Sequence, residues 1–113
     1  MTPLRCTIGC HRPDDGAAHL DLFLEQDGRL LTWRLPLSGL PPVGGSVPAQ
    51  ALPDHRLPYL DFEGAIGRGL GAITVDRQGT WERVGDAPFT FRVCWGADEE
   101  TYRLQAGELQ RLE

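Results

Sequence analysis

The chain lacks lysine altogether: all 11 of its basic residues are arginine, and 16 acidic residues bring the formal net charge to −5. A protein that holds a long stretch of nucleic acid needs a basic stripe, because neutralised phosphates supply most of the affinity. The sequence contains no obvious stripe of this kind. Any contact with nucleic acid is therefore expected to be local, at an end or a single phosphate, or to depend on a partner.

Long apolar runs are missing as well. No window of about 18 apolar residues could cross a membrane, and the N-terminus lacks the charged and then apolar segments of a secretory signal. We therefore expect a cytoplasmic protein with no membrane contact.

Cysteine is scarce, and the spacing of the cysteines matches no paired motif. Cys6, Cys10 and Cys94 form an odd set without a C-x-x-C motif. A zinc site made of Cys6, Cys10 and His11 is conceivable, but small buried thiols in a reducing cytoplasm are the favoured interpretation. The cysteines are assigned to packing.

Glycine and proline are abundant, with 14 and 9 residues in a chain of 113. This length fits one domain over residues 1–113, and the composition favours short strands joined by tight turns. Strands are expected at residues 4–10, 20–24, 30–35, 72–76, 80–84, 89–95 and 101–104, with a last short strand or tail at 107–113. The predicted fold is all-β and mainly antiparallel, a small closed or nearly closed β-barrel with at most one or two short helical turns.

The segments between these strands carry their own expectations. Turns are expected at Gln78-Gly79 and Gly85-Asp86, and a long surface loop at residues 36–48. Pro53 and Pro58 allow at most one helical turn, around residues 49–52, before the chain becomes extended.

The stretch HLDLFLEQDGRLLTWRLP, residues 19–36, is typical of a β-hairpin that turns at Asp27-Gly28. Its first strand begins with His19 and Asp21, and residues two apart on a strand point to the same face. Together with His11, they offer two imidazoles and one carboxylate, a set that suits Mn²⁺ or Zn²⁺ with open positions for water or a substrate oxygen. The alternative is that both histidines are surface residues and Asp21 is a solvated strand end.

Three segments in order carry a family resemblance: HLDLFLEQDGRLLTWRLP, PDHRLPYLDFEG and GRGLGAITVDRQGTWE. Over about residues 5–84 the chain resembles the 3′-phosphoesterase domain of bacterial DNA ligase D and its stand-alone relatives. The positions that match the family pattern are His11, His19, Asp21, Glu25, Thr32-Trp33, Asp54-His55, Tyr59, Phe62-Glu63-Gly64 and Gly79-Thr80-Trp81-Glu82.

The resemblance implies a small β-barrel that holds manganese and trims a 3′-phosphate or 3′-ribonucleoside from DNA or primer ends, leaving a hydroxyl. His11, His19 and Asp21 would then be the metal ligands. His55 and Tyr59 would contact the scissile phosphate, and an imidazole can exchange protons at neutral pH. The implied partners are DNA or RNA-DNA 3′ ends, with a ligase or polymerase acting in trans. Trp33, Phe62 and Trp81 are assigned to the core.

The chain departs from the family pattern at three places. Phe23 stands where the family has a phosphate-binding arginine, and Leu37 stands where it has a lysine. The spacer between His11 and His19 is also longer, although loop length is tolerant. Arg34 is the nearest candidate to supply the lost positive charge.

Three hypotheses follow from these residues. The first is a metal-dependent phosphoesterase acting on nucleic-acid 3′ ends, which retention of the matching histidines, Asp21 and Tyr59 favours. The second is a catalytically weakened or inactive relative that serves as a binding module in DNA repair, which Phe23, Leu37 and the acidic charge favour. The third is a phosphoesterase for small molecules, which would explain the missing basic stripe.

Overall fold

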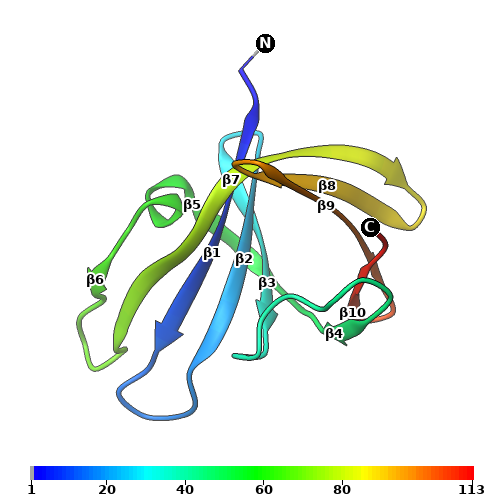
Figure 1. The fold of residues 1–113 in the computed structure, drawn as a ribbon. Coiled ribbons are helices and arrows are strands. Elements are labelled where there is room, and N and C mark those ends of the chain that lie inside the picture. The colour runs from blue at the N-terminus through cyan, green and yellow to red at the C-terminus, as the bar shows by residue number, and fades with distance from the viewer. Residues whose placement is uncertain (1) are drawn as a thin grey trace.

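The structure is a computed structural model that describes residues 2–113 (Figure 1). Its strands are β1 (Leu4–Arg12), β2 (His19–Gln26), β3 (Arg29–Leu35), β4 (Ser46–Pro48), β5 (Gln50–Arg56), β6 (Gly64–Ala65), β7 (Ala72–Asp86), β8 (Phe89–Trp95), β9 (Asp98–Gln105) and β10 (Glu108–Arg111). One 3₁₀ turn, η1 (Leu57–Leu60), follows β5. The prediction of an all-β fold with very little helix is confirmed.

The strands form a sheet in the order β4-β10-β9-β8-β7-β1-β2-β3-β5, with β6 beside β7. Every pairing in it is antiparallel, as predicted. Over residues 2–113 no ladder joins β4 to β5, the two ends of this order, so the expected closed barrel is not confirmed. The two ends are nevertheless separated by one residue, Ala49, whose N–H donates to the Gly107 carbonyl.

The helical turn that the sequence allowed at residues 49–52 does not form, because residues 50–52 begin β5. Leu52 precedes Pro53, and a residue before proline is pushed out of the α region by the proline ring. The turn forms later, in η1, where Pro58 occupies the first turn and needs no intrahelical N–H partner. In the long loop expected at residues 36–48, Ser46–Pro48 instead form β4.

The turn expected at Gln78-Gly79 is also wrong, because both residues lie inside the 15-residue strand β7. A Cβ at position 79 would lie 2.0 Å from the Cys94 carbonyl oxygen on β8. Glycine therefore serves a close approach of two backbones rather than a turn. The turn after β7 falls at residues 87–88, just past the expected Gly85-Asp86, and Figure 1 shows β7 crossing the molecule from the β6 side to the β8 side.

Alternating residues of the central strands pack into two separate clusters. On β2, Leu20, Leu22 and Leu24 belong to the main core, which also contains Trp81 and Phe91. The opposite face of the sheet holds a smaller cluster of Phe23, Leu30 and Leu60, against which Tyr59 packs. The segment that follows β5 therefore covers the β2 face that begins with His19 and Asp21.

The three cysteines are free thiols, Cys6 and Cys10 buried and Cys94 partly buried. Cys6 and Cys10 are members of the main core. Burial raises the pKa of Cys6 to about 12, which keeps this thiol protonated and unreactive at neutral pH. In residues 2–113 no helix has the length and hydrophobicity to span a bilayer.

Candidate metal centre

His11, His19 and Asp21 come together where the β1–β2 ladder ends. His11 is the cross-strand partner of His19, and Asp21 lies two residues further along β2 on the same face. The two imidazole rings meet edge to face with centroids 4.8 Å apart. One potential ligand atom from each of the three residues lies within 4.8 Å of the others. The ladder register, rather than the intervening loop, thus brings His11 to the other two residues despite the long spacer.

Two atoms of this group are buried without a partner. His19 Nε2 and Asp21 Oδ1 lie 3.5 Å apart, and neither has a hydrogen-bond partner within residues 2–113. Leaving a buried polar atom unpaired costs about 1–3 kcal/mol, so such atoms need an explanation. A cation bound between them would satisfy both, and the donor set fits a divalent metal.

The orientation of His11 also fits a ligand role. Its Nε2 lies 2.8 Å from the Leu70 carbonyl oxygen. Because a carbonyl only accepts, Nε2 donates there and the lone pair is left on Nδ1. Metal-binding histidines commonly fix their second ring nitrogen in this way.

Leu70 is held against β1 by the glycine that follows it. A Cβ on Gly71 would lie 2.1 Å from the Arg12 carbonyl oxygen, so only glycine permits this close approach. The Leu70 carbonyl could not be found from the sequence, because any residue supplies the same backbone group. The signal that was available is the glycine series that ends at Gly71.

Burial shifts the pKa values of this pair in opposite directions. Desolvation is the largest cause for both groups: it lowers the pKa of His19 and raises that of Asp21. The charge of Asp21 acts to raise the pKa of His19, and the charge of His19 acts to lower the pKa of Asp21, so each opposes the effect of burial on the other. A neutral imidazole is the form that binds metal, whereas a buried carboxylate needs a cation to offset its lost hydration.

Arg34 stands directly opposite Asp21 in the β2–β3 ladder. Cross-strand partners share a face, so its guanidinium is on the side of the metal candidate, while buried Leu35 packs into the main core. The positive charge of Arg34 acts to lower the pKa of both Asp21 and His19. This exposed arginine is thus beside the two groups, as a phosphate contact would require.

His55 and Tyr59 lie next to this group rather than within it. The His55 ring is 5.4 Å from Phe23 and 5.6 Å from Tyr59, measured between centroids. Its Nδ1 donates to the Pro53 carbonyl at 3.0 Å, which leaves the Nε2 lone pair free. The charge of His55 also acts to lower the pKa of Asp21, so the two groups are near neighbours. Tyr59 is half-buried on η1.

Other residues of the family motifs form hydrogen bonds that hold η1 and the residues after it against the sheet. Glu63 accepts a hydrogen bond from the Val75 backbone N–H at 2.8 Å. Thr7 and Gln78 both donate to the Leu60 carbonyl. Glu25 accepts from the Arg5 N–H through its side chain. The acidic residues at positions 25 and 63 are therefore tied to the backbone of the fold, a role the motif pattern did not indicate.

The aromatic motif residues are largely structural. Trp81 is buried, and its Nε1 donates to the Glu25 carbonyl. Trp33 is partly buried and packs against the main core. These two assignments to the core are confirmed, whereas Phe62 is partly exposed and its ring is 5.9 Å from that of Tyr59.

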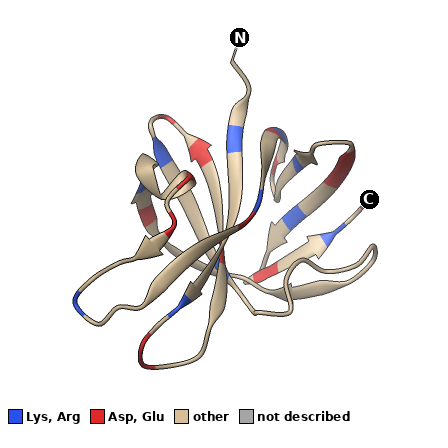
Figure 2. Ribbon diagram, turned by 60° about the vertical axis from the view of Figure 1, so that its left-hand side comes forward, with Lys and Arg blue, Asp and Glu red and all other residues tan. Residues whose placement is uncertain are grey.

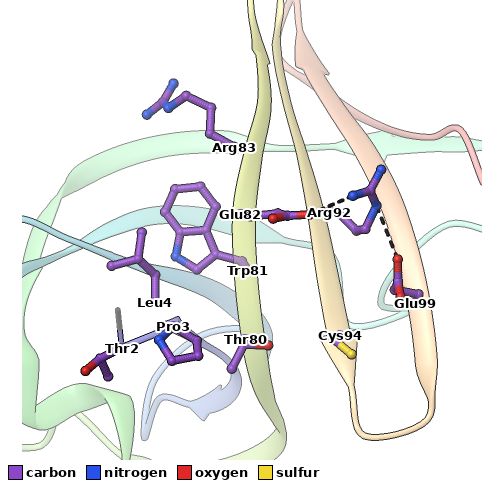
Figure 3. A pocket seen from close by; sticks show the side chains of 10 residues that line it. All are labelled: Thr2, Pro3, Leu4, Thr80, Trp81, Glu82, Arg83, Arg92, Cys94 and Glu99. Carbon is purple, nitrogen blue, oxygen red and sulfur yellow. Dashed lines mark hydrogen bonds and ion pairs between the residues drawn. The ribbon is translucent and has the colours of Figure 1, made fainter.

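A separate hollow lies away from the metal candidate (Figure 3). It measures about 500 Å³ and runs between the N-terminal segment and strands β7 to β9. Arg92 in its wall is paired with Glu82 and Glu99. None of its lining residues belongs to the metal candidate, so it adds nothing to that site.

One curated protein shows a partial similarity to this chain. The multifunctional non-homologous end joining protein LigD of Pseudomonas aeruginosa is 36% identical over 77 residues, which cover 65% of this chain and 9% of the relative. This match supports a relation between the two proteins, although the chain corresponds to a small part of the relative's length. No protein-family model matches the chain.

Proposed function

We propose that this chain is a metal-dependent phosphoesterase that processes nucleic-acid 3′ ends, as the 3′-phosphoesterase domain of DNA ligase D does. The observation that carries the proposal is the group of His11, His19 and Asp21 with its two unpartnered buried atoms. The similarity to an end-joining protein supports the same reaction class. Residues 1–113 would form one domain of this type, with a sheet that wraps into a barrel.

The metal would be held by His11 Nδ1, His19 Nε2 and an Asp21 oxygen, and Mn²⁺ fits this mixed donor set, with Zn²⁺ as the alternative. A divalent ion held by these residues would polarise a phosphoryl oxygen and lower the pKa of bound water.

His55 is the proposed proton-transfer or phosphate-contacting group. Its Nδ1 is fixed by the Pro53 carbonyl, so Nε2 is the atom that meets the scissile phosphate. Tyr59 borders the same ring and would add a hydroxyl contact. A positioned imidazole is suited to moving a proton at the attacking or leaving oxygen near neutral pH.

Arg34 is the proposed phosphate contact. Its position opposite Asp21 supports this role, and a guanidinium can bind phosphate through two parallel hydrogen bonds. Phe23 cannot supply such a contact, because its ring has no charge and no hydrogen-bond donor, and it is buried with Leu30 and Leu60. With Arg34 as the substitute, affinity for the phosphorylated end is expected to be weaker than in relatives that keep an arginine at position 23.

The partner is a DNA or RNA-DNA 3′ end, contacted locally in the cytoplasm, with a ligase or polymerase acting in trans. Figure 2 shows acidic and basic positions interspersed along the ribbon rather than gathered in one long basic stripe. Because the chain has a net charge of −5, tight binding to a long duplex is not expected, and recognition would depend on the 3′ end itself.

The test is a Mn²⁺-dependent assay on a primer-template with a 3′-phosphate or one 3′-ribonucleotide, beside a chromogenic bis-aryl phosphate. His55→Ala should lower turnover by about 10²-fold or more while metal uptake and folding persist. Arg34→Gln should raise KM for the primer, whereas Arg103→Gln on β9 removes the same charge far along the sheet and serves as the control.

The alternatives predict other outcomes. Failure of every divalent metal to support turnover, with metal binding intact, would favour the binding module, for which Phe23 at the phosphate position is the supporting observation. Cleavage of the small ester alone would favour a small-molecule phosphoesterase.

A further inference from the structure

Phe23 stands where the family resemblance leads one to expect an arginine, and its ring is held on several sides. The side chain is 1% exposed and packs with Leu30 and Leu60, which are themselves buried. Leu60 is fixed in turn, because its carbonyl accepts hydrogen bonds from the Thr7 hydroxyl at 2.8 Å and the Gln78 amide at 3.0 Å. The Phe23 ring is therefore a well-anchored part of the fold.

The same ring extends toward the metal candidate. In the β1–β2 ladder Phe23 pairs with Thr7, whereas Asp21 pairs with Gly9. A Cβ built on Gly9 would nevertheless lie only 3.4 Å from Cε2 of Phe23. The ring thus lies beside Gly9, which has no side chain to exclude it, and leans from its own position toward the end of β2 that carries Asp21.

The imidazole of His55 lies against this ring. The centroids of His55 and Phe23 are 5.4 Å apart, with 50° between the ring planes. Tyr59 meets the imidazole edge to face, with centroids 5.6 Å apart, and packs against the same small cluster. Leu30, a member of that cluster, is the partner of His55 in the β3–β5 ladder. Since cross-strand partners share a face, the ladder register explains why the imidazole reaches Phe23.

The hydrogen bond of His55 does not by itself fix Nε2. The Pro53 carbonyl that accepts from Nδ1 lies two residues away on the same strand. This bond sets which nitrogen carries the proton, but the ring remains free to tilt about it. The two aromatic contacts restrict that tilt, and Phe23 is the more deeply buried of the two.

We infer that Phe23 is a positioning residue for His55, whose Nε2 it holds in place to meet the scissile phosphate. This inference rests on the proposed function and gives position 23 a role other than phosphate binding. A misplacement of about 1 Å can cost about 10²-fold in rate. Loss of the ring should therefore lower kcat while metal binding and substrate affinity persist.

The experiment begins with Phe23→Leu, which keeps an apolar side chain in the cluster and removes the ring. On the 3′-phosphate primer-template with Mn²⁺, kcat should fall about tenfold or more and KM should stay within about twofold. Phe91→Leu is the matched control, because it makes the same change at an equally buried phenylalanine of the main core. It should leave kcat unchanged. Circular dichroism melting checks folding, and Phe23→Met takes the place of Phe23→Leu if the latter does not fold.

A double-mutant cycle with His55→Ala separates positioning from a merely structural role. If Phe23 acts through His55, adding Phe23→Leu to His55→Ala should change kcat by less than about twofold. A loss as large as that in the wild-type background would overturn the inference.

A second readout does not depend on turnover. In NMR spectra of the imidazole Cε1–H groups, the His55 resonance is identified by its absence from His55→Ala. Removing an aromatic ring whose centroid lies 5.4 Å away should shift this resonance in Phe23→Leu, and Phe91→Leu should leave it in place. An unshifted resonance in Phe23→Leu would overturn the contact on which the inference depends.

Phe23→Arg tests the role of the position directly. This substitution supplies the charge that the family resemblance leads one to expect, but it removes the ring. We expect kcat to fall as in Phe23→Leu, with KM no higher than in the wild type. A kcat above that of the wild type would overturn the positioning role, because position 23 would then serve catalysis better with a phosphate contact.

Failures of the two proposals are distinguishable. Turnover by the wild type, combined with a kcat in Phe23→Leu equal to that in Phe91→Leu, would overturn the positioning role and leave the enzyme standing. Absence of wild-type turnover with every divalent metal would overturn the enzyme. The shift of the His55 resonance would then decide whether Phe23 holds the imidazole.

Discussion

The Nε2 atom of His19 and the Oδ1 atom of Asp21 face each other across 3.5 Å, both buried and both without a hydrogen-bond partner among residues 2–113. Folding has removed these two atoms from water without replacing the hydrogen bonds that water would make to them. The pair is therefore expected to weaken the metal-free protein and to bind a cation that offsets the cost.

Metal binding should raise the melting temperature, because a ligand that binds the native state alone stabilises it by mass action. At a Mn²⁺ concentration about 100 times Kd, a gain of about 2.7 kcal/mol corresponds to a rise on the order of 10 °C. Asp21→Ala should abolish the rise, and Asp15→Ala, which removes an exposed carboxylate from the loop between β1 and β2, should keep it. Differential scanning fluorimetry measures both, and an undiminished rise in Asp21→Ala contradicts the site.

Asp21→Asn should stabilise the metal-free protein at neutral pH. Burial raises the pKa of Asp21, so ionisation of this carboxylate is costlier in the folded than in the unfolded state. The neutral amide escapes that cost, so a higher midpoint of urea unfolding than in the wild type is expected. Urea unfolding in the presence of a chelator is the measurement. A large loss of stability would mean that the carboxylate has a partner in the folded protein.

The metal-induced rise in Tm should shrink as the pH falls below about 6.5. Both imidazoles and the carboxylate must be deprotonated to bind. Burial lowers the pKa of His19 from its usual 6.5, so His19 protonates in the folded state only at a lower pH, and binding persists somewhat below 6.5 before it is lost. Because the unfolded state takes up this proton first, stability from His19 is also lost as the pH falls through that window. Melting curves with and without Mn²⁺ between pH 5 and 8 test this, and a pH-independent difference would exclude histidine ligands.

Gly79→Ala should destabilise the protein by about 2–3 kcal/mol, because the new Cβ would meet the Cys94 carbonyl oxygen at 2.0 Å. Gly85→Ala, on the same strand, meets Thr90 at 3.6 Å in ordinary contact and should change stability by less than about 0.5 kcal/mol. Chemical denaturation compares the two variants. Equal effects would place β7 and β8 further apart than described.

The hairpin of β2 and β3 was predictable because its alternating residues and its Asp27-Gly28 turn agree with each other. The prediction of a turn at Gly79 was wrong, because the sequence alone does not distinguish a glycine needed for close approach of two strands from a glycine needed for a turn. The grouping of His19 with Asp21 followed from their spacing. The approach of His11 did not, because it depends on the register between β1 and β2.

The environment of the site was less predictable than its ligands. The face of Arg34 depends on which neighbour enters the main core, and that neighbour is Leu35. The contact of the Leu70 carbonyl with His11 is a product of tertiary structure, which no local pattern in the sequence encodes.

On β2, odd-numbered residues from 19 to 23 line the candidate site and even-numbered residues from 20 to 24 fill the main core. The two faces of β2 thus pack against different sets of side chains. Position 23 can therefore hold either an arginine or a phenylalanine while the fold is kept. The positive charge can instead be carried by a neighbouring strand, as by Arg34 on β3. The scaffold is thus open to redesign, since new ligands can be installed at three odd positions while the leucines stay fixed.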